Sequence, residues 1–122
     1  MEMWLGMKTA SIESHSQQVV DMTGAASVKM RMLIGPAERA PTFHMREFEV
    51  GPGGHTPHHE HDFEHEIVVL SGRGVVRSPE GDRPIKVHDV VYVPPNERHQ
   101  FVNTGDSPLR FICLIPAPVG CT

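Results

Sequence analysis

Turn-forming residues interrupt this chain so often that long helices have no room to form. The 122 residues include 11 glycines and 11 prolines, and pairs such as Gly35-Pro36 and Gly51-Pro52 stop one extended segment after another. Between these breaks, apolar residues alternate with polar ones or form short runs, which is the pattern of β-strands. No segment has the length and period of an amphipathic helix. The sequence therefore predicts an all-β protein.

The predicted strands are short and follow one another at regular spacing. They cover residues 27–34, 42–50, 67–70, 74–78, 85–87, 90–93, 99–103 and 109–115. In the first, alternation places Met30 and Ile34 on the same face, and in the second the run Gly51-Pro52-Gly53-Gly54 is expected to end the strand. Short strands separated by such turns are typical of an antiparallel β-barrel or jelly roll, in which closure of the sheet removes exposed edges.

The chain is long enough for one domain with a single core. Residues 1–27 have little apolar periodicity, so we expect an irregular arm with at most a short strand at 18–22. Residues 28–118 should form the barrel. Residues 119–122 follow two prolines and are expected to be a frayed tail.

Charge, hydropathy and cysteine content narrow the location and the partners of the protein. The formal net charge is -4 without any run of basic residues, which argues against nucleic acid as a partner. Nothing approaches about 18 consecutive apolar residues, so no membrane segment is expected, and the N-terminus lacks the pattern of an export signal. Cys113 lies in an apolar run and Cys121 near the C-terminus, which indicates no disulfide framework. We therefore expect a soluble cytoplasmic protein.

Histidines are concentrated in one stretch, between Gly53 and Gly72, which holds five of the nine in the chain. On an extended strand His59 and His61 leave the same face, and His65 keeps that parity. His99, at the start of a distant apolar strand, is the candidate for a fourth member of the group. Imidazole is the commonest metal ligand in proteins, so the pattern predicts a metal site.

The two histidine segments resemble the motifs of the cupin superfamily. The first motif has the form Gly, five residues, His-x-His, three or four residues, Glu, six residues, Gly, and it is matched by Gly53, His59, His61, His65 and Gly72. The second is matched by Pro94, Asn96, His99 and Asn103. The resemblance implies a cupin jelly roll, one divalent metal ion per chain, and a homodimer whose N-terminal strands cross to the neighbouring sheet.

At the third ligand the chain departs from the family pattern, because His65 replaces the usual glutamate. This makes the chain similar to the small single-domain bacterial cupins that bind manganese through four histidines. Glu66 would fit the longer spacing, but it would lie closer to Gly72 and on the face opposite to Ile67, so His65 is preferred. His58 could replace His59, but only His59 gives both the gap from Gly53 and the His-x-His pair.

Two further departures concern turns. His88 stands where the second motif usually has glycine, which suggests a less tight turn. Asn96 also replaces a glycine, and asparagine is the residue that most readily adopts a positive φ in place of glycine.

Four neutral imidazoles would leave the charge of a divalent ion uncompensated, which makes the ion a stronger Lewis acid. If the coordination is octahedral, two positions remain open for water, dioxygen or a bidentate anion. Nitrogen ligands suit zinc, copper, iron and nickel. The resemblance adds manganese, which is the ion we expect first.

Arg46 is the candidate for binding a substrate anion. Alternation puts His44, Arg46, Phe48 and Val50 on one face. If that face is the interior, the guanidinium can bind an anion on the metal in a bidentate way; the alternative is a surface or interface salt bridge with Glu47 or Glu66. Three residues of the last two strands are candidates for the cavity wall, although plain core packing is the simpler explanation for them: Phe101, Phe111 and Cys113.

The remaining histidines are interpreted as solvated or packed side chains, namely His15, His44, His55, His58 and His88. Two functions fit the predicted site. The first is a metal-dependent enzyme, dioxygenase-like or a lyase or isomerase, that acts on a small anionic or enolisable molecule. The alternative is a non-catalytic module that binds or senses a small ligand or the metal itself.

Overall fold

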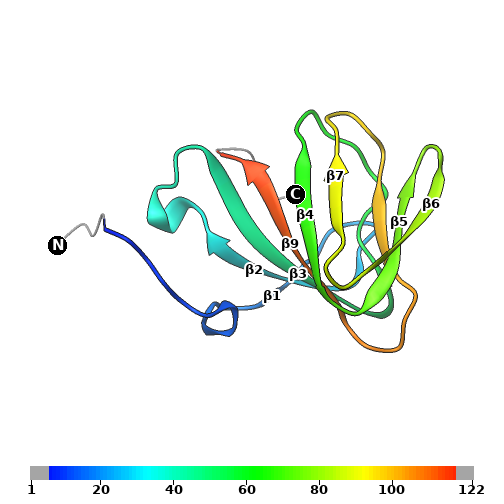
Figure 1. Ribbon diagram of the computed structural model, residues 1–122, viewed down its shortest axis with the longest axis horizontal. Helices are drawn as coiled ribbons and strands as arrows, with labels where there is room; N and C mark the ends of the chain where they lie inside the picture. The colour runs from blue at the N-terminus through cyan, green and yellow to red at the C-terminus, as the bar shows by residue number, and fades with distance from the viewer. Residues whose placement is uncertain (1–5, 118–122) are drawn as a thin grey trace.

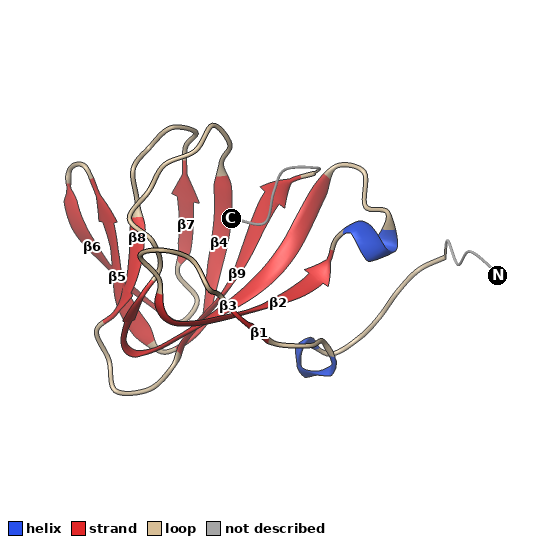
Figure 2. Ribbon diagram, turned by 180° about the vertical axis from the view of Figure 1, so that it is seen from behind, coloured by secondary structure: helices blue, strands red, loops and turns tan. Residues whose placement is uncertain are grey.

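The computed structural model describes residues 6–117, and within them the protein is built almost entirely of strands (Figures 1 and 2). In chain order the elements are η1 (Ile12–Ser14), β1 (Gln18–Val19), β2 (Ala26–Ile34), η2 (Pro36–Glu38), β3 (Phe43–His55), β4 (His65–Ser71), β5 (Arg73–Ser78), β6 (Gly81–Lys86), β7 (Val90–Val93), β8 (Gln100–Asn103) and β9 (Leu109–Pro116). Neither short helix is long or apolar enough to cross a membrane. The expected all-β fold is confirmed. The predicted tail at 119–122 and Cys121 lie outside the described residues.

All strands pair in an antiparallel way in one curled sheet. The strand order is β6-β5-β8-β3-β9-β4-β7. The long strand β3 pairs with β8 and β9 along one edge and with β2 along the opposite edge, and β1 pairs with β2. The sheet curls into a half-barrel, as Figure 2 shows. The longest strand, β3, joins its parts, because its first half lies between β2 and β9 while His55 at its end pairs with Val102 of β8.

The expected end of the second strand at Gly51-Pro52-Gly53-Gly54 is wrong, because β3 continues through these residues to His55. Gly53 has a φ of +76°, a conformation that glycine adopts without strain. A Cβ atom added to Gly54 would lie 2.5 Å from the carbonyl oxygen of Ala26. The glycines therefore bend the strand and bring β2 close to it.

The alternation expected in β2 holds only for part of the strand. Val28 is buried, but the register with β3 shifts between Met32 and Ile34. Because of this irregularity Ile34 pairs with Met45 and is 37% exposed. Leu33 is 5% exposed and lines a pocket together with Ile12 of the N-terminal arm. A bulge of this kind reverses the facing of the residues that follow it.

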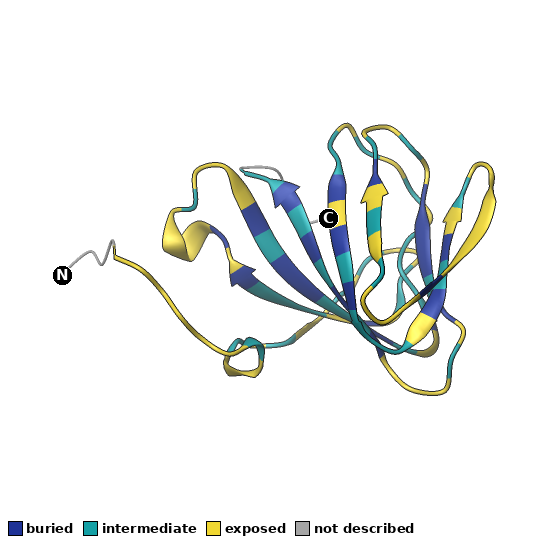
Figure 3. Ribbon diagram, viewed as in Figure 1, coloured by how far each residue is buried: buried dark blue, intermediate teal, exposed yellow. Residues whose placement is uncertain are grey.

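Buried and less buried residues alternate along the strands, as the bands of Figure 3 show, and the buried apolar side chains form one core cluster. Along β9 every second side chain is buried. Val50, Val69 and Leu109 are fully enclosed, and burying side chains of this size contributes about 1.5–3 kcal/mol each. This packing fixes which face of β3, β4 and β9 points inward.

Of the two unusual turn residues, one has the conformation expected from the sequence and the other does not. Asn96 has a φ of +65°, as its place in the second motif suggests. The expectation of a less tight turn at His88 is wrong, because His88 also adopts a positive φ of +75°. The turn is closed by a hydrogen bond from the Asp89 amide to the Lys86 carbonyl.

Candidate metal centre

Backbone hydrogen bonds hold the two histidine segments together. His59 and His99 exchange two of them, at 3.1 and 2.9 Å, and form an isolated antiparallel bridge. The Thr56 amide donates to the Phe101 carbonyl, and the Asn96 amide donates to the His61 carbonyl. Backbone hydrogen bonds alone therefore align two segments that lie about 40 residues apart in the sequence.

The four histidines predicted as ligands come together. Ring centroids lie 5.0 Å apart for His59 and His61, 4.6 Å for His61 and His65, and 5.1 Å for His65 and His99. The possible ligand nitrogens of His59, His61 and His99 all lie within 4.8 Å of one another. Nε2 of His65 lies 2.9 Å from Nε2 of His61, which places His65 beside this group.

Carbonyl groups fix the tautomer of two of the rings. Nδ1 of His61 lies 3.1 Å from the Phe63 carbonyl oxygen, and Nδ1 of His99 lies 2.8 Å from the Glu97 carbonyl oxygen. A carbonyl oxygen only accepts, so each Nδ1 donates and each neutral ring presents a lone pair at Nε2. This is the arrangement that metal-binding histidines usually show.

Burial keeps the rings neutral. It lowers the pKa of His59 to about 4, with a further contribution from the neighbouring imidazoles. The pKa of His65 falls even further, first because of burial and then because of the charge of Arg46. Burial also lowers the pKa values of His61 and His99. Four neutral imidazoles in this arrangement fit a divalent transition metal ion.

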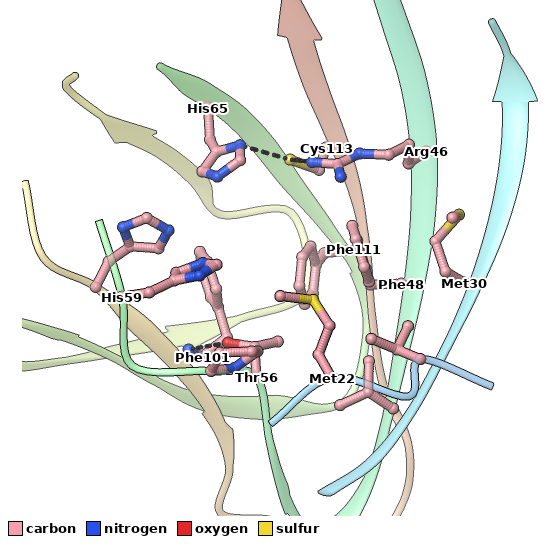
Figure 4. A pocket seen from close by; sticks show the side chains of 14 residues that line it. Met22, Met30, Arg46, Phe48, Thr56, His59, His65, Phe101, Phe111 and Cys113 are labelled. Carbon is pink, nitrogen blue, oxygen red and sulfur yellow. Dashed lines mark hydrogen bonds between the residues drawn. The ribbon is translucent and has the colours of Figure 1, made fainter. Parts of the chain in front are cut away.

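Arg46 extends from β3 into the same interior and is 1% exposed. Its Nη2 donates to Sγ of Cys113 at 3.3 Å, and its Cζ lies 4.9 Å from the centre of the Phe48 ring. Sγ of Cys113 lies 3.2 Å from Nδ1 of His65. Burial raises the pKa of the Cys113 thiol. Figure 4 shows this row from Arg46 through Cys113 to His65.

A small cavity of about 60 Å³ lies between the rings and Arg46. His59, His65 and His99 line it together with Arg46, whereas His61 is not among its lining residues. A cavity of this size suits a small ligand.

The cavity wall contains the three candidates that the sequence suggested, Phe101, Phe111 and Cys113. All three also belong to the buried hydrophobic core, so core packing and cavity lining are compatible. Sequence reasoning missed Met22, which reaches the cavity from the N-terminal arm, where no periodicity marks it. It also missed Phe63, which stacks on His61 with centroids 4.0 Å apart.

The salt bridge considered for Arg46 is not formed with Glu47. Glu47 faces away from the cavity, and its carboxylate pairs with Arg31 at 2.8 Å and Arg110 at 2.6 Å. Of the histidines interpreted as solvated or packed, His88 is exposed, and His44 is buried but does not line the cavity.

Comparisons with known proteins agree with this geometry. The family described as the cupin domain matches residues 46–115. An oxalate-binding protein of Thermotoga maritima is 31% identical over 115 residues, which cover 90% of this chain and 93% of that protein. The structure of a polyketide cyclase from Streptomyces resistomycificus is similar with a TM-score of 0.86 and 32% identity, covering 91% of this chain and 80% of that one.

A third relative is similar over a shorter region. The 1-methylthio-D-xylulose 5-phosphate methylsulfurylase of Rhodospirillum rubrum is 36% identical over 76 residues, which make up 62% of this chain. The chain spans about half the length of that protein, 49%. Relatives of this fold thus include both enzymes and a binding protein.

Proposed function

The chain belongs to the cupin family, and from this we propose that it holds one divalent transition metal ion through His59, His61, His65 and His99 and acts on a small anionic or enolisable molecule. The observation that carries the proposal is the small cavity that Arg46 shares with the imidazole group. We propose manganese as the native ion because of the resemblance to four-histidine cupins. The reaction is that of a dioxygenase-like enzyme or of a lyase or isomerase.

The chemistry of the cavity favours a carboxylate or an enolate. The planar guanidinium of Arg46 matches a carboxylate in a bidentate way. The ion, when bound, supplies Lewis acidity toward a carboxylate or enolate oxygen. Phe48, Phe101 and Phe111 line the cavity with apolar surface, and a less polar surrounding strengthens electrostatic contacts inside it.

The size of the cavity narrows the ligand further. A cavity of about 60 Å³ favours a two- or three-carbon acid over a sugar phosphate as the ligand. The relative from Thermotoga maritima is an oxalate-binding protein, and it spans nearly the whole of this chain. We therefore propose short keto acids and dicarboxylates as the ligands to test first.

The test combines metal analysis with activity. Protein expressed without supplementation should contain close to one equivalent of a transition metal, measured by plasma mass spectrometry, and His99→Ala should lose it. His88→Ala is the matched control, because His88 is exposed and outside the ring group. Samples loaded with manganese, iron, nickel, copper or zinc are then assayed with short keto acids and diketones, with and without dioxygen. Absence of turnover with every loaded metal would count against the enzyme.

A non-catalytic binding role is the second candidate. Among the described residues that line the cavity, none is an aspartate or glutamate that could serve as a general base. A ligand that binds tightly and is recovered unchanged after aerobic incubation with each metal would favour this role. In that role the metal site and Arg46 would bind the ligand without converting it.

We further propose a cytoplasmic homodimer with one barrel domain, over residues 28–118, per chain. Val90 and Tyr92 on the end strand β7 are 79% and 57% exposed, so this strand offers apolar surface for a contact. Light scattering at micromolar concentration should give twice the mass of the chain. A monomer would contradict this part of the proposal.

A further inference from the structure

We propose that Cys113 is a positioning residue that allows His65 to change tautomer when the site takes up a metal ion. The inference rests on the proposed metal site. Cys113 lies opposite Arg46 in the pairing of β3 with β9 and opposite Ile67 in the pairing of β4 with β9. Its thiol therefore sits between the guanidinium and the ring of His65, within hydrogen-bond distance of both.

Without a metal ion, the directions of the hydrogen bonds follow from His61. Its Nδ1 donates to the Phe63 carbonyl, so its Nε2 can only accept. Nε2 of His65, 2.9 Å away, must then donate to it. A neutral His65 with its hydrogen at Nε2 has a lone pair at Nδ1, and the thiol of Cys113 donates to that lone pair.

With a metal ion, the directions must change. A ligand nitrogen has to present its lone pair, so Nε2 of His65 loses its hydrogen and the neutral ring carries one at Nδ1. Nδ1 then donates to Sγ of Cys113. One proton leaves Nε2 and one is gained at Nδ1, so the charge of the ring does not change.

The thiol can follow this exchange because it both donates and accepts. Its hydrogen can turn from His65 toward the Leu114 carbonyl oxygen, which lies 3.9 Å from Sγ. Arg46 donates to Sγ in either case, so the sulfur stays hydrogen-bonded throughout. Serine keeps both abilities, whereas alanine has neither. The structure thus assigns to Cys113 a role that depends on the donor and acceptor capacity of its side chain.

Nuclear magnetic resonance of ¹⁵N-labelled histidine rings tests the exchange directly. Zinc is the probe because it is diamagnetic. In the chelator-treated protein His65 should carry its hydrogen at Nε2, and in the zinc-loaded protein at Nδ1, while His61 should keep Nδ1–H in both. The same tautomer of His65 in both samples, with zinc bound, would overturn the inference and leave the metal site standing.

Zinc affinity of three variants, measured by chelator competition, tests the role of the thiol. Cys113→Ala should weaken binding about 10- to 100-fold, the usual effect of losing a residue that orients a metal ligand, and Cys113→Ser should restore most of it. Ile115→Val is the matched control, because Ile115 is buried on the same face of β9 and its truncation loses packing alone.

Three further results would overturn the inference. One is a Cys113→Ala protein that binds zinc as tightly as the wild type. Another is an intense sulfur-to-metal charge-transfer band in the cobalt-loaded protein, because the thiol would then be a ligand itself. The third is a wild-type protein that binds no zinc, cobalt or manganese, which would remove the proposed metal site and this inference with it.

Discussion

Arg46 and Glu47 are adjacent on β3, both charged and both almost fully buried, yet they face opposite sides of the sheet. Glu47 lies between Arg31 and Arg110, which pair with its two oxygens. Arg46 lines the cavity that holds His59 and His65. On one face of the strand Glu47 is paired within the fold, and on the other Arg46 lies beside the cavity.

The difference shows that burial of a charge does not by itself indicate function. On the outer face the N-terminal arm closes over the ion pairs, since the His15 carbonyl accepts from Nε of Arg31 and Glu13 pairs with Arg110. These groups serve stability. On the inner face Arg46 is equally buried, but it lies beside a cavity and a group of neutral imidazoles. There we propose that an anion is recognised.

The largest expected effect is on the outer face. Glu47→Gln leaves two guanidinium groups without their carboxylate, and breaking a buried ion pair costs about 3–5 kcal/mol. Because Arg31 and Arg110 keep some contact with water, we expect a loss near the lower end, measured by urea denaturation. Glu49→Gln is the control and should cost much less, because Glu49 is only half-buried. Comparable losses for the two variants would show that the ion pairs of Glu47 stabilise the fold no more than a half-buried carboxylate does.

The second effect belongs to the inner face and to binding. Arg46→Met should weaken binding of oxalate to the manganese-loaded protein about 10- to 100-fold, the value of a hydrogen bond to a charged group. The free energy of unfolding should change less than in Glu47→Gln. Arg98→Met removes an exposed charge next to His99 and is the control. Titration calorimetry gives both affinities, and equal losses would mean that only net charge matters.

The sequence predicted the inner face better than the outer one, for a physical reason. The spacing of the motifs, a local property of the chain, brings His59, His61 and His65 together, although residues 60–64 are a loop and not the extended strand that the parity argument assumed. The burial of Glu47 depends on where the N-terminal arm folds, which no local pattern records. The path of β3 through Gly51-Pro52-Gly53-Gly54 was missed because turn-forming residues here serve the close approach of β2, a tertiary contact.

The third prediction uses pH to separate the two faces. The folded pKa of His59, about 4, lies below its ordinary value of 6.5, and that of His65 is also lowered. Between those pH values the unfolded chain binds protons that the folded chain does not, so stability falls as the pH drops from about 6.5 toward 4. Denaturation of chelator-treated protein should show this slope. His59→Gln should reduce the slope and His88→Gln should not, and an unchanged slope in His59→Gln would contradict the assignment to the inner face.

The smallest expected effect concerns the residues that the N-terminal arm contributes to the inner face. Val20 and Met22 line the cavity, although β1 has only two residues and the following turn is held by hydrogen bonds from Val20 to Val28 and from Ala25 to Met22. Met22→Ala removes three heavy atoms from the cavity wall. Because Met22 is half-buried, we expect a stability loss of about 1 kcal/mol or less.

The same variant should change the ligand preference more clearly than the stability. Relative to oxalate, four- and five-carbon dicarboxylates should gain about tenfold in affinity, as expected when a few heavy atoms of an apolar wall are removed. Met32→Ala is the matched control, because Met32 lies on β2 but does not line the cavity. If both variants bind the whole series of acids as the wild type does, the arm does not limit ligand size, and the inner face is defined by the barrel strands alone.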